Sequence, residues 1–288
     1  MVRRPESFVI MSNMQTALKT LIQRTLPAGV QARLWRSYNR IQNRGQRYHC
    51  PLCGAHLKTL WPRGLNHPVL TRYDIIGGGF REHASCPVCG STERERLVWL
   101  YISQRTNLLQ RPARLLHVAP ERELGARLRR APQLDYLSAD LYDDAVMVKM
   151  DITAIPYPNA SFDAIICNHV LEHVPDDAKA LAEFYRVLAP GGWAILQVPY
   201  SQQLTTSIED PSIVSASERA RVFGQEDHVR IYAKKDYVQR LEQARFSVEC
   251  FDWQEAGPDF GNPDNHFGLM PRETLFIART SPHSSSQP

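Results

Sequence analysis

Four cysteines form the strongest chemical signal in this chain of 288 residues. They stand in two copies of the pattern Cys-Pro-x-Cys-Gly: Cys50, Cys53, Cys86 and Cys89. Two sulfurs separated by two residues can face one ion from a single tight turn, and the glycine after each pair allows the positive φ of such a turn. Four thiolates fill the tetrahedral coordination of Zn²⁺ and leave no position for water. We therefore expect a structural Zn²⁺ ion here.

A disulfide framework is the alternative for these cysteines. Disulfide scaffolds are typical of short secreted domains, whereas these pairs lie within a long chain in which we find no secretory signal. Zinc binding contributes about 10–16 kcal/mol to the folding of comparable modules, so loss of one ligand should unfold the module. Cys167 and Cys250 stand alone in apolar stretches, a pattern that predicts buried small side chains.

A second metal pattern is His169-x-x-Glu172-His173, which matches the H-x-x-E-H motif of one class of zinc proteases. Catalytic zinc would need both histidines on one face of a stable helix. Here a strand-like run ends just before His169 and Pro175 follows His173 closely, so only a short turn fits between the histidines. We therefore disfavour the protease and expect His173 to be a packed structural residue.

Residues 225–232 combine acids, a histidine and an arginine. His228 could act as a general base for a hydroxyl or amine, and Arg230 could bind an anionic group of a substrate. The alternative is a salt-bridged loop that supports the stretch before it. The sequence leaves both interpretations open.

These residues need a scaffold, and from residue 114 the chain alternates between short apolar runs and amphipathic patterns. We predict strands at residues 115–119, 136–139, 146–152, 162–167, 193–198, 246–253 and 273–278. We predict helices at residues 94–109, 122–130, 176–188 and 235–244. Such alternation indicates an α/β fold, a largely parallel sheet with helices on both faces.

The N-terminal part differs in charge from the rest. Residues 1–47 carry nine Lys and Arg against the single acid Glu6, a net charge of +8, which leaves −4 for residues 48–288 out of the total of +4. Two amphipathic patterns, at residues 14–22 and 30–41, flank a Pro-Ala-Gly break. Such helices could contact anionic lipid at a membrane surface, RNA, or the body of the protein.

We divide the chain into four segments. Residues 1–47 form a basic amphipathic helical segment, residues 48–96 a zinc-ribbon-like module of short hairpins, residues 97–280 the α/β domain, and residues 281–288 a disordered tail. In the inner loop of the module, which contains three consecutive glycines, we predict no regular element.

Several motifs follow one another over residues 151–199. They are an acid that closes the third strand, an aromatic-Pro turn, Ser-Phe-Asp at the fourth strand, Leu-Glu-His, and Arg-Val-Leu-x-Pro-Gly-Gly before the fifth. In this order they resemble the core of class I, type 11-like, S-adenosylmethionine-dependent methyltransferases. The resemblance implies a Rossmann-like seven-stranded methyltransferase sheet over residues 97–280 and S-adenosyl-L-methionine as the cofactor.

The resemblance also implies roles for residues at the strand ends, where ligands of open α/β sheets bind. Asp140 would accept hydrogen bonds from the ribose hydroxyls and Asp151 one from the adenine amino group, while Ile152 would pack on the adenine. A helix cap or a solvated loop acid is the alternative for each carboxylate. Asn168 and His169 would lie beside the sulfonium or the substrate.

The loop after the first strand departs from the family. Where the family has an acid followed by Gly-x-Gly, this chain has His117-Val118-Ala119-Pro120-Glu121. Small Ala119 and rigid Pro120 could still allow the methionine end of the cofactor to approach, and Glu121 could bind its ammonium group.

Together these features predict a methyltransferase that acts on a small molecule or glycan-type metabolite, at an oxygen atom. From residue 48 onward the chain is slightly acidic and shows no aromatic-basic track for single-stranded RNA. The alternatives are an RNA methyltransferase that uses the module and the basic N-terminus, and a catalytically silent interaction module, which the missing Gly-x-Gly would explain. No apolar run approaches the roughly 18 residues of a membrane span, so we expect a cytoplasmic protein.

Overall fold

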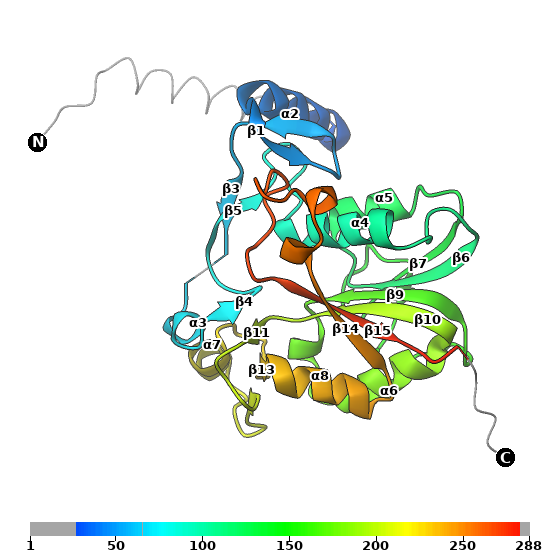
Figure 1. Ribbon diagram of the computed structural model, residues 1–288. Coiled ribbons are helices and arrows are strands. Elements are labelled where there is room, and N and C mark those ends of the chain that lie inside the picture. Colours follow the sequence, from blue (N-terminus) through cyan, green and yellow to red (C-terminus); the bar gives the residue numbers. More distant parts are fainter. Residues whose placement is uncertain (1–26, 65, 283–288) are drawn as a thin grey trace, which may run out of the picture.

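The computed structural model describes residues 27–64 and 66–282, and its centre is a sheet of seven strands in the order β14-β15-β10-β9-β6-β7-β8 (Figure 1). Strands β6 to β10 pair in parallel, and β15 runs antiparallel to both of its neighbours. The strands are β6 (Ala113–Val118), β7 (Leu134–Asp140), β8 (Val148–Lys149), β9 (Phe162–Asn168), β10 (Leu188–Gln197), β14 (Ser247–Asp252) and β15 (Thr274–Arg279). The predicted α/β fold with a seven-stranded methyltransferase sheet is confirmed.

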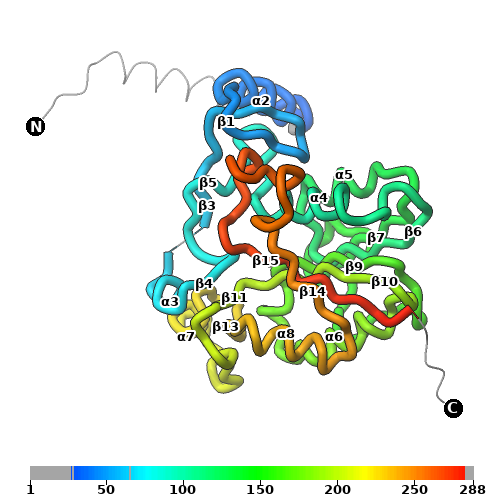
Figure 2. Tube along the Cα trace, viewed as in Figure 1, coloured from blue at the N-terminus to red at the C-terminus, as the bar shows by residue number. Residues whose placement is uncertain are grey.

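Helices cover both faces of this sheet (Figures 1 and 2). Helices α4 (Glu93–Arg105) and α5 (Arg122–Leu128) lie on one face, and α6 (Asp177–Val187) and α8 (Lys234–Gln243) lie on the other. Because side chains alternate along a strand, Ile166 of β9 joins the core under α4 and α5, whereas Ile165 and Cys167 join the core under α6 and α8. Cys167 is buried as predicted, but Cys250 on the edge strand β14 is exposed, so that prediction is wrong.

The cysteine module consists of short antiparallel pairs. Strand β1 (Arg44–Cys50) pairs with β2 (Ala55–Leu57), and β3 (Trp61–Arg63) pairs with β5 (Arg81–Ser85). Between β3 and β5 the chain forms α3 (Pro68–Arg72) and β4 (Ile75–Ile76), where the sequence predicted no regular element.

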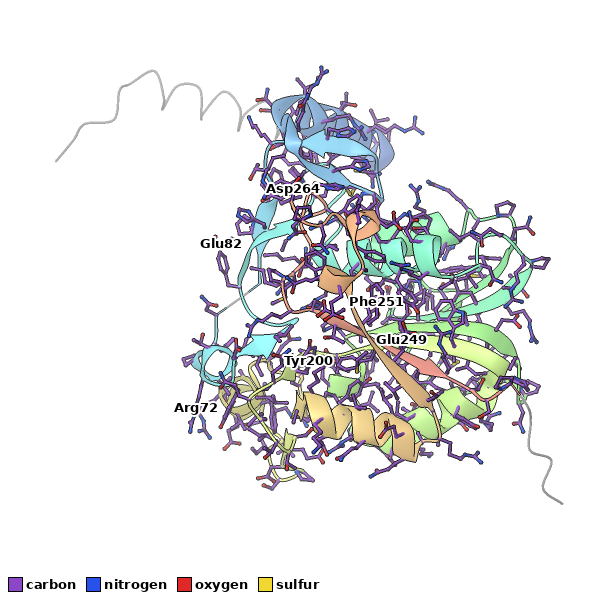
Figure 3. The ribbon with its side chains drawn as sticks, viewed as in Figure 1. Arg72, Glu82, Tyr200, Glu249, Phe251 and Asp264 are labelled. Carbon is purple, nitrogen blue, oxygen red and sulfur yellow. The ribbon has the colours of Figure 1, made fainter. Side chains whose placement is uncertain are left out.

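Strand β4 connects the module to a second sheet beside the large one. It pairs antiparallel with β11 (Tyr200–Ser201). Strand β11 pairs in parallel with β13 (Arg230–Ala233), which pairs antiparallel with β12 (Ile208–Glu209). Helix α7 (Ala216–Phe223) packs against α3. Figure 3 labels Tyr200 where these segments meet. The inner loop of the module is thereby fixed at the carboxyl edge of the seven-stranded sheet.

A segment between β14 and β15 also contacts the module. It contains the 3-10 helices η2 (Trp253–Glu255) and η3 (Pro258–Phe260). Arg47 of β1 donates a hydrogen bond of 2.9 Å to the carbonyl of Asp264, which Figure 3 labels. The fully buried Arg96 of α4 donates to the carbonyls of Phe267 and Gly268 on this segment, and to those of Ala84 and Ser91 in the module.

Helix α2 (Ala28–Gln42) occupies the second predicted amphipathic pattern. Its contacts with the body of the protein are polar: Arg36 pairs with Glu123 of α5 at 2.5 Å, and Arg40 donates to the carbonyl of Cys53. The apolar side chains of the pattern are largely exposed, up to 73% at Ile41. The first pattern, at residues 14–22, and most of the predicted tail lie outside the described residues. Over the described residues, no helix is long and apolar enough to cross a membrane.

Candidate functional site

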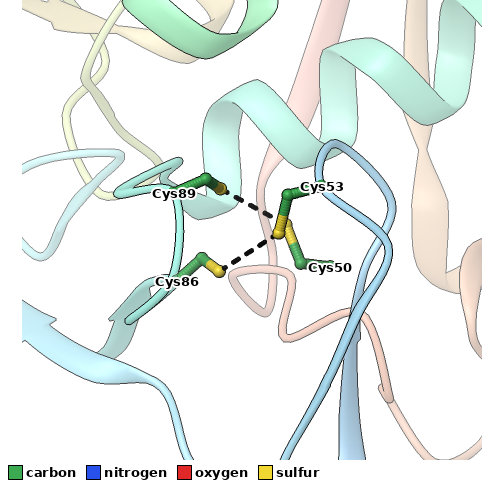
Figure 4. A group of neighbouring side chains, drawn as sticks. All are labelled: Cys50, Cys53, Cys86 and Cys89. Atoms are coloured by element: carbon green, nitrogen blue, oxygen red, sulfur yellow. Dashed lines mark hydrogen bonds between the residues drawn. The ribbon is translucent and has the colours of Figure 1, made fainter. Parts of the chain in front are cut away.

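The four cysteines of the module converge on one point (Figure 4). The sulfurs of Cys50 and Cys89 lie 3.7 Å apart and those of Cys53 and Cys86 lie 3.8 Å apart, and all four fall within 4.8 Å of one another. Ligands at about 2.3 Å from a tetrahedral ion lie about 3.8 Å apart, which is the spacing found here. A disulfide would need about 2.05 Å, so the cysteines are free thiols arranged as a ligand set.

The two cysteine turns have the same backbone structure. In each, the amide of the glycine donates a hydrogen bond of 2.8 Å to the carbonyl of the first cysteine, Gly54 to Cys50 and Gly90 to Cys86. Both glycines have positive φ, 67° and 85°. The repeated Cys-Pro-x-Cys-Gly pattern thus produces a repeated turn that aims two sulfurs the same way.

The loop after β6 makes a tight turn without glycine. Ala119 has a φ of 46°, in the left-handed region that glycine usually occupies, and its amide donates to the carbonyl of Ala139 on β7. Gly125 on α5 allows Pro120 to pack closely, because a Cβ there would lie 3.3 Å from the Pro120 Cβ. The glycine-poor loop therefore keeps a backbone conformation that a glycine-rich loop would adopt.

Glu121 connects the ends of two neighbouring strands. Its Oε2 lies 3.0 Å from Nε2 of His117, and its Oε1 accepts a hydrogen bond of 2.9 Å from Nδ2 of Asn168 at the end of β9. Burial alone would raise the pKa of Glu121, but the contacts with His117 and Asn168 outweigh it and hold the pKa below the usual value. Glu121 therefore places a negative charge between β6 and β9.

Asp140 and Asp151 lie at the same carboxyl edge, and the amide of Met150 donates to the carbonyl of Asp140. Hydrogen bonds within the described residues engage only the Oδ1 atom of each: Asp140 accepts from two loop amides, and Asp151 accepts from Thr153. Ile152 is 5% exposed and packs into the core. Both acids are thus held in turns with the second carboxylate oxygen available to a ligand.

A polar cluster lies beside these strand ends. Apart from Asn39, the buried side-chain atoms without a hydrogen-bond partner among the described residues come from six side chains, which we call the polar cluster: Glu93, Arg94, Asn168, His169, Glu172 and Glu273. Buried polar atoms are nearly always paired, so such a concentration indicates a place for water or a ligand.

His169 is the most constrained member of the polar cluster. Its backbone φ is 55°, a value that non-glycine residues rarely adopt, and its amide donates a hydrogen bond to the carbonyl of Gln197. Its Nδ1 lies 3.3 Å from Oε1 of Glu172 while its Nε2 is unpaired. Burial, together with the charge of Arg94, holds the pKa of His169 well below the usual value. Strain of this kind concentrates at functional positions.

Three contributors to this edge were not predicted from the sequence. Arg94 comes from the start of α4 and interacts electrostatically with Glu273 and Glu172. Glu273 precedes β15 and accepts a hydrogen bond of 2.6 Å from Gln197. A Cβ at Gly77 of the module would lie 3.2 Å from Glu273 and 3.3 Å from the His169 ring. Arg94 stands among other charged residues and Glu273 follows Pro-Arg, so the sequence carried no signal that singled them out.

His228 and Arg230 lie at the start of the second sheet with different surroundings. His228 is 9% exposed, and its ring packs edge-on against that of His173 at a centroid distance of 4.7 Å. Burial, and next the neighbouring His173, lowers the pKa of His228 to about 4. The Arg230 guanidinium donates to the carbonyls of Leu171, Val174 and Pro175 and pairs with Glu209, which favours a supporting role for this side chain over substrate binding.

Comparison with known proteins finds similarity in the central part of the chain. Residues 106–196 match the model of a family described as "Methyltransferase domain". A demethylmenaquinone methyltransferase of Deinococcus radiodurans is 30% identical over 115 residues, which is 34% of this chain and 48% of the relative. A 27-O-demethylrifamycin SV methyltransferase of Amycolatopsis mediterranei is 41% identical over 54 residues, 19% of this chain and 20% of the relative. The chain spans less than half the length of either relative.

Among solved structures, the chain is similar to a 1,6-didemethyltoxoflavin-N1-methyltransferase of Burkholderia thailandensis that was crystallised with S-adenosylhomocysteine. The TM-score is 0.41 at 16% identity, over 66% of this chain and 78% of that one. So distant a likeness adds nothing to what the strand order shows about the fold.

Proposed function

We propose that this chain, which carries a class I methyltransferase domain, transfers the methyl group of S-adenosylmethionine to an oxygen atom of a small molecule or glycan-type metabolite. The observation that carries the proposal is the convergence of polar groups with unused hydrogen-bonding capacity at the carboxyl edge of the sheet. In open α/β sheets this edge is where ligands bind.

The residues at this edge fit the cofactor. Asp140 and Asp151 each keep a carboxylate oxygen for the ribose and adenine, and Glu121 offers a negative charge to the ammonium group. When bound, the sulfonium supplies an already activated methyl group. The chain's own residues then need only to orient the acceptor and exclude water, and orientation alone can be worth about 7–11 kcal/mol. We place Ala119, Pro120, Ile152, Asn168 and His169 around the same site.

The acceptor class is supported by the names of the relatives. Demethylmenaquinone and 27-O-demethylrifamycin SV are small organic molecules, and the second name denotes transfer to oxygen. Neither the RNA methyltransferase nor the silent interaction module gains support from the described residues or from these names. We therefore keep a small-molecule acceptor as the proposal.

We further propose that Cys50, Cys53, Cys86 and Cys89 bind a structural Zn²⁺ ion. The sulfur spacing and the duplicated turn support this. His228, with its pKa near 4, is a neutral imidazole at neutral pH. A neutral imidazole can take up a proton from an acceptor, as a general base does, or it can bind a metal ion.

Calorimetric titration of the zinc-loaded full-length chain with S-adenosylmethionine tests the proposed function. We expect saturable binding in a 1:1 complex, weakened about tenfold or more by Asp140→Ala, because a hydrogen bond to a charged group contributes about 1.5–3 kcal/mol. The matched control is Asp135→Ala, at the exposed opposite end of the same strand, which should bind like the parent. Absence of binding heat in the parent protein would favour the silent module.

A further inference from the structure

Glu172, His173 and His228 form a second group of metal-binding side chains, separate from the cysteines. Each offers a ligand atom, and the three atoms lie within 4.8 Å of one another. Glu172 and His173 belong to the 3-10 helix η1 (Leu171–His173), and His228 precedes β13. The chain thus brings together a carboxylate and two imidazoles from distant parts of the sequence.

The two distant parts are held together by the backbone. The amide of Val229 donates a hydrogen bond of 2.9 Å to the carbonyl of Glu172. Arg230 adds hydrogen bonds of 2.6 Å to the carbonyl of Val174 and 2.8 Å to that of Pro175. These contacts fix η1 against the start of β13, so the three side chains are positioned before any ion arrives.

His173 has the hydrogen bonding typical of a metal ligand. Its Nδ1 lies 3.1 Å from Oδ2 of Asp227, so Nδ1 carries the proton that it donates to this carboxylate. Its other nitrogen, Nε2, then presents a lone pair, 4.0 Å from Oε1 of Glu172. Metal-binding histidines almost always donate their second ring N–H to a carboxylate or carbonyl in this way.

His228 contacts two neighbours outside its own segment. Its ring interacts with the backbone of Phe223, the last residue of α7. The edge-on packing against His173 places the two rings 4.7 Å apart between centroids. His173 is therefore oriented by a carboxylate outside the group, and His228 by its packing against His173.

Glu172 provides an independent indication of a bound cation. Its side chain is 2% exposed, and Oε2 has no hydrogen-bond partner among the described residues. A buried carboxylate oxygen without a partner is costly, and a bound cation would satisfy it. Two ligands about 2.1 Å from one tetrahedral ion lie about 3.4 Å apart, so the 4.0 Å between Glu172 and His173 needs only a small side-chain shift for them to share an ion.

We propose that Glu172, His173 and His228 bind one divalent transition-metal ion of the zinc, cobalt or iron(II) type. Two imidazoles and one carboxylate suit these ions better than Mg²⁺ or Ca²⁺, which prefer all-oxygen sites. Three protein ligands leave a coordination position open, and His173, with 28% of its side chain exposed, is the ligand nearest to solvent.

The open position gives the ion a role if the proposed function holds. Glu172 also contacts His169, which follows the end of β9 where we place the methyl donor. An oxygen atom of the acceptor bound to the ion would therefore lie beside the donor. This last step rests on the proposed function, whereas the metal site does not.

The competing explanation is a metal-free ion-pair network. In it, Arg94 serves as the counter-ion of Glu172, with which it interacts electrostatically, and the two histidines only pack. The two explanations differ in one measurable property, the number of metal ions that the full-length chain binds.

Titration with Co²⁺ tests the site. The sample is the full-length, zinc-loaded chain after dialysis against a mild chelator, which leaves the thiolate-bound ion in place. We expect one equivalent of Co²⁺ with weak visible bands and without the sulfur-to-cobalt absorption that thiolates produce. His173→Gln and His228→Gln should each abolish this equivalent, and Asp227→Asn should weaken binding about 10–100-fold. His83→Gln, at an exposed histidine elsewhere, should bind Co²⁺ like the parent.

Two results would overturn the site: no Co²⁺ equivalent beyond the thiolate ion in the parent chain, or unchanged uptake in folded His173→Gln and His228→Gln. Circular dichroism of each variant establishes that it is folded. S-adenosylmethionine binding is measured in the same samples. Cofactor binding without Co²⁺ uptake overturns the metal site alone, and Co²⁺ uptake without cofactor binding supports the site and overturns the proposed function.

Discussion

Two residues at adjacent strand ends, Ala119 after β6 and His169 after β9, adopt the left-handed backbone conformation. Each such residue costs on the order of 1–3 kcal/mol, and the surrounding structure must hold it in place. Here the holding contacts are amide hydrogen bonds to neighbouring strands, from Ala119 to Ala139 and from His169 to Gln197. Two of the strained backbone positions therefore lie where β6 and β9 turn toward the proposed cofactor.

Glu273 offers a test of the electrostatics at this edge. Burial raises its pKa from 4.5 to about 7, although Arg94 partly opposes the shift. The folded chain therefore keeps this proton over a pH range in which the unfolded chain has lost it. Stability from this group is fully present below pH 4.5 and is lost as the pH rises through about 7.

We expect Glu273→Gln to remove this pH dependence. The amide keeps an acceptor for Gln197, so the variant should gain free energy of unfolding relative to the parent between pH 5 and pH 8, by at most about 3 kcal/mol. Urea unfolding across this pH range measures the difference. Glu242→Gln, at an exposed position of α8, should show no such trend. A parent and Glu273→Gln variant whose stabilities change in parallel with pH would contradict the interpretation.

At the scale of elements, the strands with strong apolar runs were predicted well. Strand β9 was predicted at residues 162–167 and occupies Phe162–Asn168, and α6 was predicted at 176–188 and occupies Asp177–Val187. Strand β8 is only Val148–Lys149 where residues 146–152 were predicted. Periodicity thus located these elements, but it did not give the length of β8.

The elements that the sequence did not predict are held by segments that lie far away along the chain. Strand β4 has two residues, too few for any alternation, and exists because β11 pairs with it across the chain. The same pairing brings Gly77 to the polar cluster. The capping box of Thr92 and Glu95 starts α4 at a point where Arg94 joins the same cluster. The sequence could place Asn168 and His169 at a strand end, but not the side chains that the module contributes.

Arg96 ties these elements together, and its removal should be severe. It is fully buried and donates to four carbonyls: two in the module and two in the segment before β15. In Arg96→Met the methylene volume remains, but the carbonyls lose their donor, so we expect a loss of about 3–5 kcal/mol of unfolding free energy. Arg105→Met, an exposed arginine on the same helix that donates to one carbonyl, should cost less than about 1 kcal/mol. Equal costs in denaturant unfolding would show that Arg96 does not connect the module to the helix.

At the scale of the whole molecule, the module and the sheet share one hydrophobic core. Cys50, Leu52 and Val88 belong to the same buried cluster as Ile166 of β9 and Ile195 of β10. The sequence predicted a module that the loss of one zinc ligand would unfold. A continuous core implies that module and sheet stabilise each other, since domains with separate cores are the ones that unfold independently.

Loss of the proposed Zn²⁺ ion should therefore unfold the sheet as well as the module. Zinc binding of about 10–16 kcal/mol is comparable to the total stability of about 5–15 kcal/mol that most domains have. In Cys53→Ser we expect zinc content to fall and hydrogen exchange to accelerate together in peptides of the module and of β9 and β10. Cys250→Ser, at the exposed cysteine outside the quartet, should leave both unchanged. The opposite result would be that β9 and β10 stay protected from exchange in zinc-free Cys53→Ser while the module exchanges freely. In that case the shared core does not couple the two parts, and the sheet should bind its cofactor without the metal.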